Sequence, residues 1–308
     1  ILLNHPMVEI SYAHSESHGN EPFYKVHKDL LGETEMKFSD EYHFNIDLIF
    51  LCVSAGNGKK FVENNYPHLK NIKVIDLSPD YRFSPKNRYG EMRFTYGLPE
   101  INRNEIIANP FFIANPGCFA TGIELALIPL AFAGLLEDDL HINAVTGSTG
   151  AGQGLSPTVS FSWRNNNFSS YKVFEHQHLG EIAFIIKKLQ AGYNKKINFI
   201  PNRGNFTRGI YSTVYTRCDL GLEKIENIYK YYYENHPFVH LSKDDLDLKS
   251  VINTNKCYIN LRLNGDTLII TSVIDNLLKG ASGQAVQNMN ILYGWDENMG
   301  LKLKGVAF

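Results

Sequence analysis

Short apolar runs alternate with helical patterns over the first 136 residues of the chain. The predicted strands are 7–15 (MVEISYAHS), 47–56 (DLIFLCVSAG), 71–78 (NIKVIDLS) and 109–117 (NPFFIANPG), and the predicted helices are 57–66 (NGKKFVENNY) and 121–136 (TGIELALIPLAFAGLL). Buried strands that end in small or turn-forming residues and are separated by helices are typical of a parallel sheet with crossover connections. We therefore expect a Rossmann-like α/β domain at this end of the chain.

The pattern changes after about residue 136. Strands rich in β-branched and aromatic residues are expected within 139–148, 198–219 and 257–276, and amphipathic helices within 178–193 and 221–238, with a last helix over 282–294. Such a composition predicts an α+β domain with a mixed sheet and helices on one face. We assign 1–117 and 282–308 to a dinucleotide-binding domain, and 118–281 to a catalytic, substrate-binding and self-association domain.

Charge and cysteine spacing narrow the class of protein. The chain has 30 Lys and Arg against 32 Asp and Glu, a formal net charge of −2, and no basic run, so neither a nucleic-acid nor a membrane partner is expected. Its longest apolar stretch is interrupted by Glu124 and Pro129, as a membrane span would not be. The four cysteines form no C-x-x-C pair, so no metal site is expected. Cys52, Cys218 and Cys257 lie in strand-like runs and are predicted to be small buried or half-buried thiols.

Cys118 is the strongest candidate for chemistry. It follows a Pro-Gly turn and begins a helical pattern (ANPGCFATG), so its thiol is expected at a helix N-terminus. The positive end of the peptide dipoles stabilises a thiolate there, which predicts a lowered pKa. A structural buried thiol and a metal ligand are the alternatives.

Two histidines could exchange protons with this thiol. His176 and His178 stand two residues apart (EHQHLGE), so in an extended segment their side chains would share one face. An acid/base role fits better than a metal site, because no further ligands stand at suitable spacing. A pair of surface histidines remains the alternative.

Glycines and arginines supply candidate binding groups. Gly147, Gly150 and Gly152 directly follow a predicted strand, where backbone can approach a ligand closely; a flexible connection is the alternative. Arg82 and Arg208 are candidate anion clamps, since a guanidinium binds carboxylate or phosphate with two donors.

In combination, the motifs VIDLSPDYRF, TYGLPE, ANPGCFATG, TGSTGAGQ, HQHLGEI, TRGIYSTVY and VIDNLLKGASGQAVQNMN resemble the N-acetyl-γ-glutamyl-phosphate reductase family of arginine biosynthesis. They occur in the family's order over about residues 48–300. A more distant likeness is to aspartate-semialdehyde dehydrogenase.

The resemblance implies a mechanism and roles for individual residues. Cys118 would attack an acyl phosphate and form a thioester, which a nicotinamide hydride reduces to the semialdehyde. His178, with His176 beside it, would carry the acid/base role. Glu181, Arg208, Arg82 and Asn115 would hold substrate or its phosphate.

The resemblance also predicts a cytoplasmic homo-oligomer, a dimer or tetramer, that uses NADP, with NAD as the alternative. The expected nucleotide contacts are Ser15, Ser17, Ser54, Gly147, Gly150, Gly152 and Asn288. Glu16 would repel the 2′-phosphate of NADP. The family's first strand and glycine-rich turn are expected to precede Ile1.

Some positions depart from the family pattern, which usually has HRHxPE where this chain has HQHLGE and Arg where it has Gln153. Because Gln153 and the segment SPTVSFSWRNNNF are expected near the substrate, Arg164 is a candidate ligand for an N-succinyl carboxylate, with a solvated loop as the alternative. Two other readings stay open: an aspartate-semialdehyde-dehydrogenase-like reductase of β-aspartyl phosphate, and a non-catalytic nucleotide sensor of the same fold.

Overall fold

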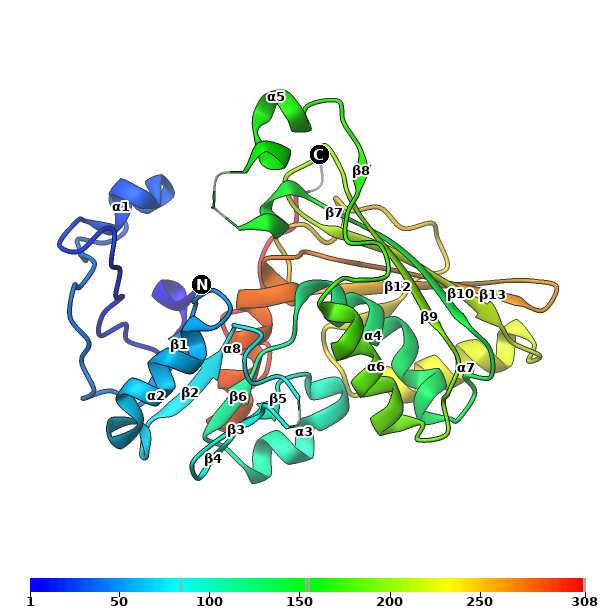
Figure 1. Ribbon diagram of the computed structural model, residues 1–308, viewed down its shortest axis with the longest axis horizontal. Helices are drawn as coiled ribbons and strands as arrows, with labels where there is room; N and C mark the ends of the chain where they lie inside the picture. The colour runs from blue at the N-terminus through cyan, green and yellow to red at the C-terminus, as the bar shows by residue number, and fades with distance from the viewer. Residues whose placement is uncertain (84, 153, 155, 307–308) are drawn as a thin grey trace.

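The computed structural model describes residues 1–306 except Ser84, Gln153 and Leu155, and it contains two main sheets joined by a long buried helix (Figure 1). Gln153, singled out in the sequence, thus lies outside the described residues. The fold is α/β, as the sequence predicts.

The first sheet is parallel and has four strands in the order β1-β2-β6-β5. Its strands are β1 (Leu48–Leu51), β2 (Lys73–Asp76), β5 (Thr95–Tyr96) and β6 (Phe112–Ala114), and a small hairpin of β3 (Arg88–Tyr89) and β4 (Met92–Arg93) precedes β5. Helix α2 (Asn57–Leu69) packs Val62 and Leu69 on one face. Helices α3 (Pro99–Ala108) and α8 (Gly283–Leu292) share a second core with Ile75 and Ile113 of the sheet.

The second sheet is mixed and has seven strands in the order β11-β12-β13-β10-β7-β9-β8. These are β7 (Leu140–Thr146), β8 (Ser169–Ser170), β9 (Ile197–Arg203), β10 (Ile210–Arg217), β11 (Val239–Leu241), β12 (Cys257–Asn264) and β13 (Thr267–Ile274). Helices α4 (Cys118–Phe132), α6 (His178–Leu189) and α7 (Leu222–Tyr233) pack on it and complete the largest core. Apart from residues 7–15, the strands and helices that the hydrophobic pattern predicts are present.

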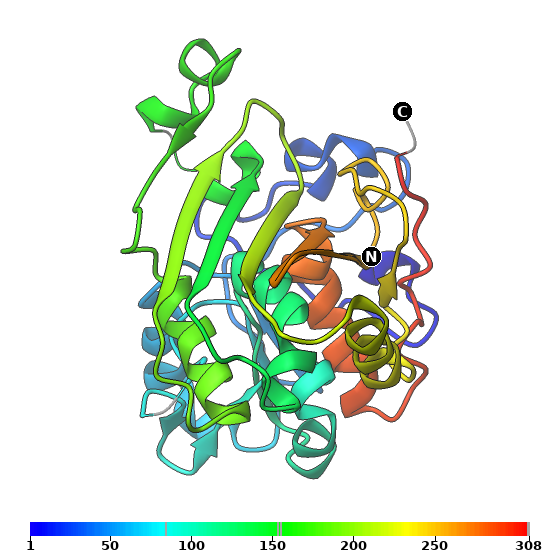
Figure 2. The same ribbon diagram turned by 90° about the vertical axis from the view of Figure 1, so that its right-hand side faces the viewer.

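A projecting segment, residues 156–175, extends beyond the end of the second sheet (Figures 1 and 2). We call it the arm. It contains a single-turn helix, α5 (Phe161–Arg164), and strand β8, and it ends just before His176. The turn η3 (Ser148–Ala151) precedes the arm, η4 (Pro157–Val159) is the first turn within it, and the π-helical turn η5 (Leu278–Ser282) links β13 to α8.

The strand expected over residues 7–15 is not formed. In this segment the only bridge to other described residues joins His14 to Ser39, and a cavity of about 540 Å³ separates residues 7–14 from β1. An apolar alternating pattern becomes a strand only when a neighbouring strand accepts and donates its backbone hydrogen bonds. The remaining N-terminal elements are short: η1 (Leu2–Asn4), α1 (Phe23–Val26) and η2 (Lys28–Leu30).

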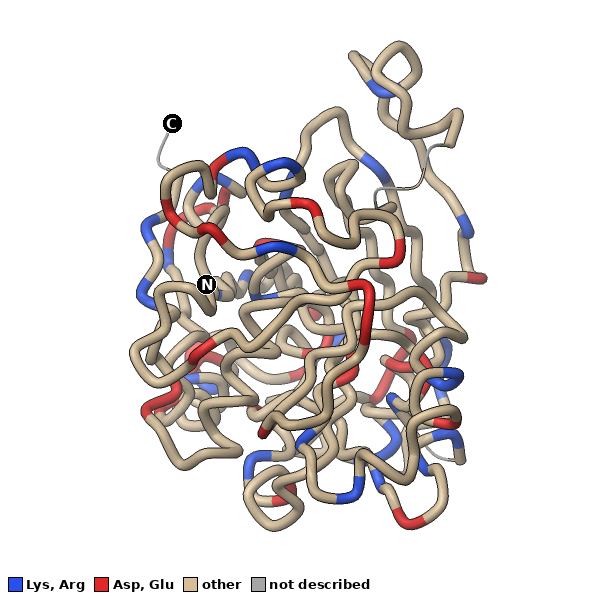
Figure 3. Tube along the Cα trace, turned by 90° about the vertical axis from the view of Figure 1, so that its left-hand side faces the viewer, with Lys and Arg blue, Asp and Glu red and all other residues tan. Residues whose placement is uncertain are grey.

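Both signs of charge are interspersed along the face of the molecule shown in Figure 3. Within the described residues, no helix is long and apolar enough to cross a membrane.

Candidate functional site

The two sheets meet around the N-terminus of α4. Strand β6 ends at Ala114, the turn Asn115–Gly117 follows, and α4 begins at Cys118. In the second sheet Ile210 pairs with both Thr146 and Ile274, so three strand ends lie along one edge. Ser272 Oγ donates to Gly122 O over 2.8 Å and fastens the first turn of α4 to this edge.

Cys118 is half-buried and tightly enclosed. A Cβ on Gly280 would lie 2.8 Å from the Cβ of Cys118, so only glycine fits where η5 passes this residue. Burial raises the pKa of the Cys118 thiol to about 11, although the Arg82 charge and the Phe119 N–H act in the opposite direction. The expected lowering of this pKa is therefore wrong in this structure, because desolvation outweighs the favourable charge and the helix-start hydrogen bonds.

The other three cysteines do not compete for this position. Cys218 and Cys257 are buried, as expected, but Cys52 is exposed. The prediction for Cys52 is wrong because β1 ends at Leu51, so the thiol stands past the carboxyl end of the strand.

The two histidines lie beside Gly117 and Phe119, the neighbours of Cys118 in the chain, but their segment is not extended. His178 is the first residue of α6, His176 lies in the preceding turn, and their ring centroids are 4.8 Å apart. A Cβ on Gly117 would lie 2.3 Å from His178 Nε2, so the imidazole borders the residue before Cys118. Both histidines are buried, which the surface alternative does not explain.

Burial keeps both imidazoles neutral. It lowers the pKa of His176 to about 4, with Lys172 and Arg203 adding to the effect. It lowers the pKa of His178 well below the ordinary value, and the Arg82 charge acts in the same direction. His176 Nδ1 accepts the backbone N–H of His178 over 3.2 Å, so a neutral His176 carries its hydrogen on Nε2.

Glu181 joins the first turn of α6 to the turn before Cys118. Its Oε1 accepts the Gly117 N–H over 2.8 Å and the Tyr96 hydroxyl over 2.7 Å, and its Oε2 accepts Arg82 over 3.0 Å. The side chain of Glu181 is 3 % exposed. These bonds place its carboxylate behind the nucleophile turn.

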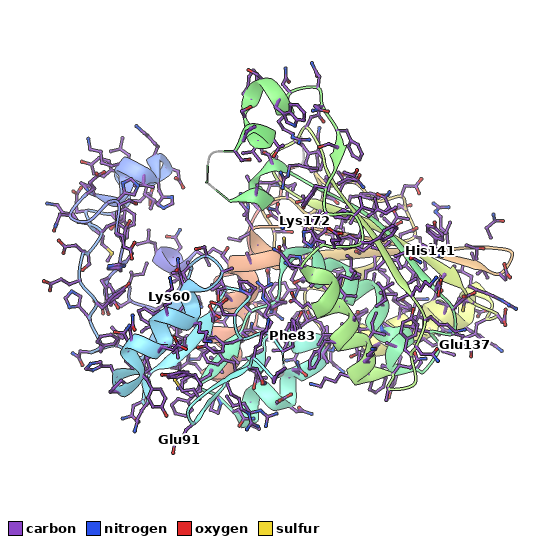
Figure 4. The ribbon with its side chains drawn as sticks, viewed as in Figure 1. Lys60, Phe83, Glu91, Glu137, His141 and Lys172 are labelled. Atoms are coloured by element: carbon purple, nitrogen blue, oxygen red, sulfur yellow. The ribbon has the colours of Figure 1, made fainter. Side chains whose placement is uncertain are left out.

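Arg82 and Asn115 are also occupied by the protein. Arg82 donates to Asn115 O, Leu77 O and Glu181, which uses three of its five N–H groups. Asn115 donates to Ala281 O and accepts from Asn288. Both side chains hold the turn in place, and Phe83, the residue after Arg82, stacks on Phe184 of α6 near the centre of the molecule (Figure 4).

Arg208 is better placed to meet a ligand. Its guanidinium is 30 % exposed and contacts Asp275 Oδ2 at 2.9 Å. The buried Arg208 Nε has no hydrogen-bond partner among the described residues. Nearby, a Cβ on Gly147 would meet Thr207 O at 2.3 Å, so this glycine allows its loop to pass Arg208 closely.

Arg164 does not face a ligand, which contradicts the prediction from the arm's sequence. Its five N–H groups are all used in bonds to Thr158 O (twice), Asn167 O, Arg203 O and Ser169 Oγ. The physical reason is that the short turns of the arm leave backbone carbonyls without partners, and Arg164 satisfies them.

The predicted nucleotide contacts lie in four places in the structure. Ser15 and Ser17 lie on the N-terminal segment with their hydroxyls 3.5 Å apart. Ser54 is exposed beyond β1 and accepts from Asn57. Asn288 is fully buried and donates to Gly97 O and Asn115 Oδ1. Gly150 and Gly152 lie in and just after η3, beside the second sheet.

Several groups at the junction are not assigned a role by the sequence reading. They are Tyr96 and Glu124, which form hydrogen bonds beneath Glu181; Asp275, which holds Arg208; and Asp80, which accepts the Gly56 and Lys59 N–H groups at the start of α2. The motifs TYGLPE and VIDNLLKG contain two of them. Nothing in local sequence indicates that Glu124, in an apolar helix, reaches the site.

Four of the buried polar atoms without a partner in the described part of the chain belong to segments around the junction of the two sheets. Buried Thr146 Oγ1, Asn288 Oδ1, Arg208 Nε and His178 Nδ1 have no hydrogen-bond partner among the described residues. Such atoms in a folded protein are usually satisfied by water or a ligand. They belong to segments at the junction of the sheets, as a substrate and a nicotinamide cofactor require. No three metal-ligating side chains cluster in the described part of the chain.

Family models match both halves of the chain. Residues 1–109 match the semialdehyde dehydrogenase NAD binding domain, and residues 118–276 match the semialdehyde dehydrogenase dimerisation domain. The match supports a nicotinamide cofactor and a tendency to self-associate.

Solved structures with a similar fold include two aspartate-semialdehyde dehydrogenases. One, from Candida albicans with NADP, has a TM-score of 0.69 and 15% identity over 96% of this chain and 94% of that one. Another, described as probable, from Pseudomonas aeruginosa, has a TM-score of 0.68 and 16% identity over 92% of this chain and 89% of that one. At this identity the likeness concerns the fold alone.

Sequence relatives are far more similar. Proteins named N-acetyl-gamma-glutamyl-phosphate reductase from Christiangramia forsetii and Flavobacterium johnsoniae are 51% and 49% identical over the whole chain and 94% of their own length. One of the same name from Karelsulcia muelleri is 52% identical over 99% of this chain and 93% of its own. With about half of its residues identical to these relatives over essentially its whole length, and with both semialdehyde dehydrogenase domains in one chain, the protein belongs to the N-acetyl-gamma-glutamyl-phosphate reductase family.

Proposed function

We propose that the chain reduces an N-acyl-γ-glutamyl phosphate to the N-acyl-glutamate semialdehyde and phosphate, as a step of arginine biosynthesis. The observation that carries the proposal is the placement of a neutral His178 against Gly117, the residue directly before Cys118 at the start of α4. The name shared by full-length relatives identifies the substrate class.

The first step is acyl transfer to Cys118. In the free site the thiol keeps its proton, because burial raises its pKa to about 11. His178, neutral and beside the nucleophile turn, takes this proton as sulfur attacks the acyl carbon. The C–O bond to phosphate breaks, phosphate leaves with the electron pair, and a thioester remains on Cys118.

Reduction and release follow on the same sulfur. A bound nicotinamide would supply the hydride. The His178 imidazolium would give the tetrahedral oxygen the proton that it took from Cys118, so that the thioester becomes a thiohemiacetal and His178 is neutral again. Neutral His178 then removes the hydroxyl proton as the C–S bond breaks, and returns this proton to the departing thiolate of Cys118, which restores the free site. His176, fixed by its bond to the His178 backbone, holds the start of α6 against the nucleophile.

Substrate binding is assigned first to Arg208. Its partly exposed guanidinium, held by Asp275, can present a terminal N–H to the substrate carboxylate, and the buried Nε–H is left without a partner among the described residues. Arg82, Asn115 and Glu181 contribute by holding the turn in which the substrate carbonyl must sit next to Cys118. Because the N–H groups of Arg164 already donate to neutral oxygens of the protein, we do not assign it to a second substrate carboxylate.

For the cofactor we propose NADP. Ser15 and Ser17 lie close enough to bind one phosphate together, and the carboxyl ends of β1, β2 and β6 form the edge at which parallel sheets bind nucleotides. Ser54 and Asn288 stand at or near this edge, and the glycines of 147–152 approach from the second sheet. The nucleotide-binding unit would comprise residues 1–117 and 282–308, and residues 118–281 would bind substrate and form a cytoplasmic dimer or tetramer.

The test is NADPH oxidation by the purified chain, followed by absorbance, with N-acetyl- and N-succinyl-γ-glutamyl phosphate. Turnover that depends on the acyl phosphate and is lost in Cys118→Ser supports the proposal. The matched control is Cys218→Ser, a buried cysteine away from the site, which should keep its activity. Turnover of β-aspartyl phosphate alone, or NADPH binding without turnover of any acyl phosphate, would overturn it. A preference for NADH would overturn the cofactor assignment only.

A further inference from the structure

Two buried carboxyl groups share one tyrosine beneath the nucleophile turn. Tyr96 Oη lies 3.0 and 2.9 Å from the two carboxyl oxygens of Glu124 and 2.7 Å from Glu181 Oε1. Glu124 is 1% exposed and Glu181 is 2% exposed, so water does not screen them from each other. Glu124 and Cys118 are the only ionisable side chains of α4.

The number of hydrogens available to Tyr96, Glu124 and Glu181 indicates which of the two carboxyl groups is charged. A phenol has one hydrogen and can donate it once, yet both carboxyl groups lie within hydrogen-bond distance of Tyr96 Oη. One of the two must therefore bring a proton of its own. Glu181 already accepts from Arg82 and from the Gly117 N–H, as an anion does. Among the described residues Glu124 has only Tyr96 as a partner, and no cation contacts it.

We propose that Glu124 is a positioning residue held as a neutral carboxylic acid, which donates to Tyr96 and thereby directs the Tyr96 proton to Glu181. This proposal deepens the proposed function and rests on it for its catalytic consequence. Glu124 then donates a hydrogen bond to Tyr96, and Tyr96 donates one to Glu181. Glu181 in turn accepts hydrogen bonds from the Gly117 N–H and from Arg82. Burial and the neighbouring Glu181 charge both act to raise the pKa of Glu124 well above its ordinary value.

Ionisation of Glu124 would reverse this order. Tyr96 would donate to the new anion, Glu181 would lose its shortest hydrogen bond, and two negative charges would face each other across one hydroxyl. Gly117 directly precedes Cys118, so a loosened Glu181 would loosen the nucleophile turn. The proton on Glu124 thus keeps the catalytic geometry in place without touching the substrate.

The decisive variant is Glu124→Gln, in which a neutral amide of the same shape can donate to Tyr96 as the acid does. Infrared difference spectra between the wild type and this variant at neutral pH should show a protonated carboxylic acid. Glu124→Gln should keep kcat within about threefold of the wild type. The matched control is Glu137→Gln, an exposed carboxylate at the far end of the molecule (Figure 4), which should show a carboxylate band instead.

Stability against pH gives a second readout that needs no activity. Because the folded pKa of Glu124 lies above the ordinary 4.5, the wild type should lose stability relative to Glu124→Gln as pH rises above 4.5. The difference in Tm should grow with pH and should be absent for Glu137→Gln.

Two further measurements test the positioning role. Tyr96→Phe should lower kcat by about tenfold or more with a smaller change in KM, and adding Glu124→Gln to it should cost little more. A carboxylate band for Glu124, a pH-independent Tm difference, or a loss of about 100-fold in kcat for Glu124→Gln would overturn the proposal. If the wild type itself turns over no acyl phosphate, the proposed function fails, while the spectra and Tm still report on Glu124.

Discussion

Arg82 and Arg164 are two buried arginines with different surroundings. The Arg82 guanidinium pairs with a buried carboxylate and two carbonyls beside Cys118, and two of its N–H groups remain. The Arg164 guanidinium donates four N–H groups to neutral oxygens of the arm and the fifth to Arg203 O at the end of β9. The sequence marks both as candidate anion clamps. The difference teaches that the neighbouring acceptors, and not the arginine itself, decide whether a guanidinium serves a site or a fold.

The largest difference between the surroundings of Cys118 and the arm is expected in the effect of mutations on kcat. Cys118→Ser should lower kcat by at least about 10³-fold, because the weaker nucleophile cannot form the thioester. Nucleotide binding and Tm should change little. Ser160→Ala, a hydroxyl on the exposed surface of the arm, is the control and should leave kcat unchanged.

The histidines next to Cys118 should show the next largest effect. His178→Asn is expected to lower kcat by about 10²- to 10⁴-fold, and His176→Asn by less. A larger loss at His176 would reverse their roles.

The pH profile tests the same pair. Because burial lowers the pKa of His176 to about 4 and that of His178 well below its ordinary value, both remain neutral at pH 6.5. The acid limb of kcat/KM should therefore lie below pH 6.5. The stability linked to His176, present above 6.5, should be lost as pH falls from 6.5 towards 4. An acid limb at or above 6.5 would contradict the buried neutral pair.

Replacing Arg82 or Arg164 by Met should have intermediate effects on stability and activity. Arg82→Met leaves the Glu181 charge buried without its cation, which is expected to cost about 3–5 kcal/mol of stability and to lower kcat. Arg164→Met leaves carbonyls unsatisfied, at about 1–3 kcal/mol, and should change kcat/KM for the N-acetyl and N-succinyl substrates equally. Urea unfolding and the ratio of the two kcat/KM values measure both. A selective loss of kcat/KM for the N-succinyl substrate in Arg164→Met would show that Arg164 does bind the succinyl carboxylate.

The smallest effect concerns thiol labelling. Desolvation raises the pKa of both thiols, that of Cys118 to about 11, but Cys52 is exposed and Cys118 is half-buried, so iodoacetamide should modify Cys52 first at neutral pH. Labelling of Cys118 should become faster as pH rises, because the thiolate fraction grows about tenfold per unit below the pKa. Mass spectrometry of peptides measures both rates. Faster labelling of Cys118 than of Cys52 at pH 7 would show that the helix N-terminus lowers the pKa of the Cys118 thiol more than burial raises it.

The sequence by itself determined the strands and helices whose pattern is continuous, such as β2, α4, α6 and the pair β12–β13, since burial enforces their periodicity. It also indicated Cys118, His176 and His178, because their positions at the start of a helix and two residues apart are local features. It failed at residues 7–15, where a strand depends on a partner elsewhere in the chain.

Only the tertiary structure decided which polar groups face the site and in which ionic form. Glu124 lies in an apolar helix and Tyr96 in a two-residue strand, yet they meet Glu181 from the second sheet's helix. Arg164 resembles a ligand clamp until its five acceptors are known. The pKa of Cys118 rises because burial by distant segments, including Gly280, outweighs the local helix start. Desolvation and hydrogen-bond partners come from residues far apart in the chain, and no local pattern contains them.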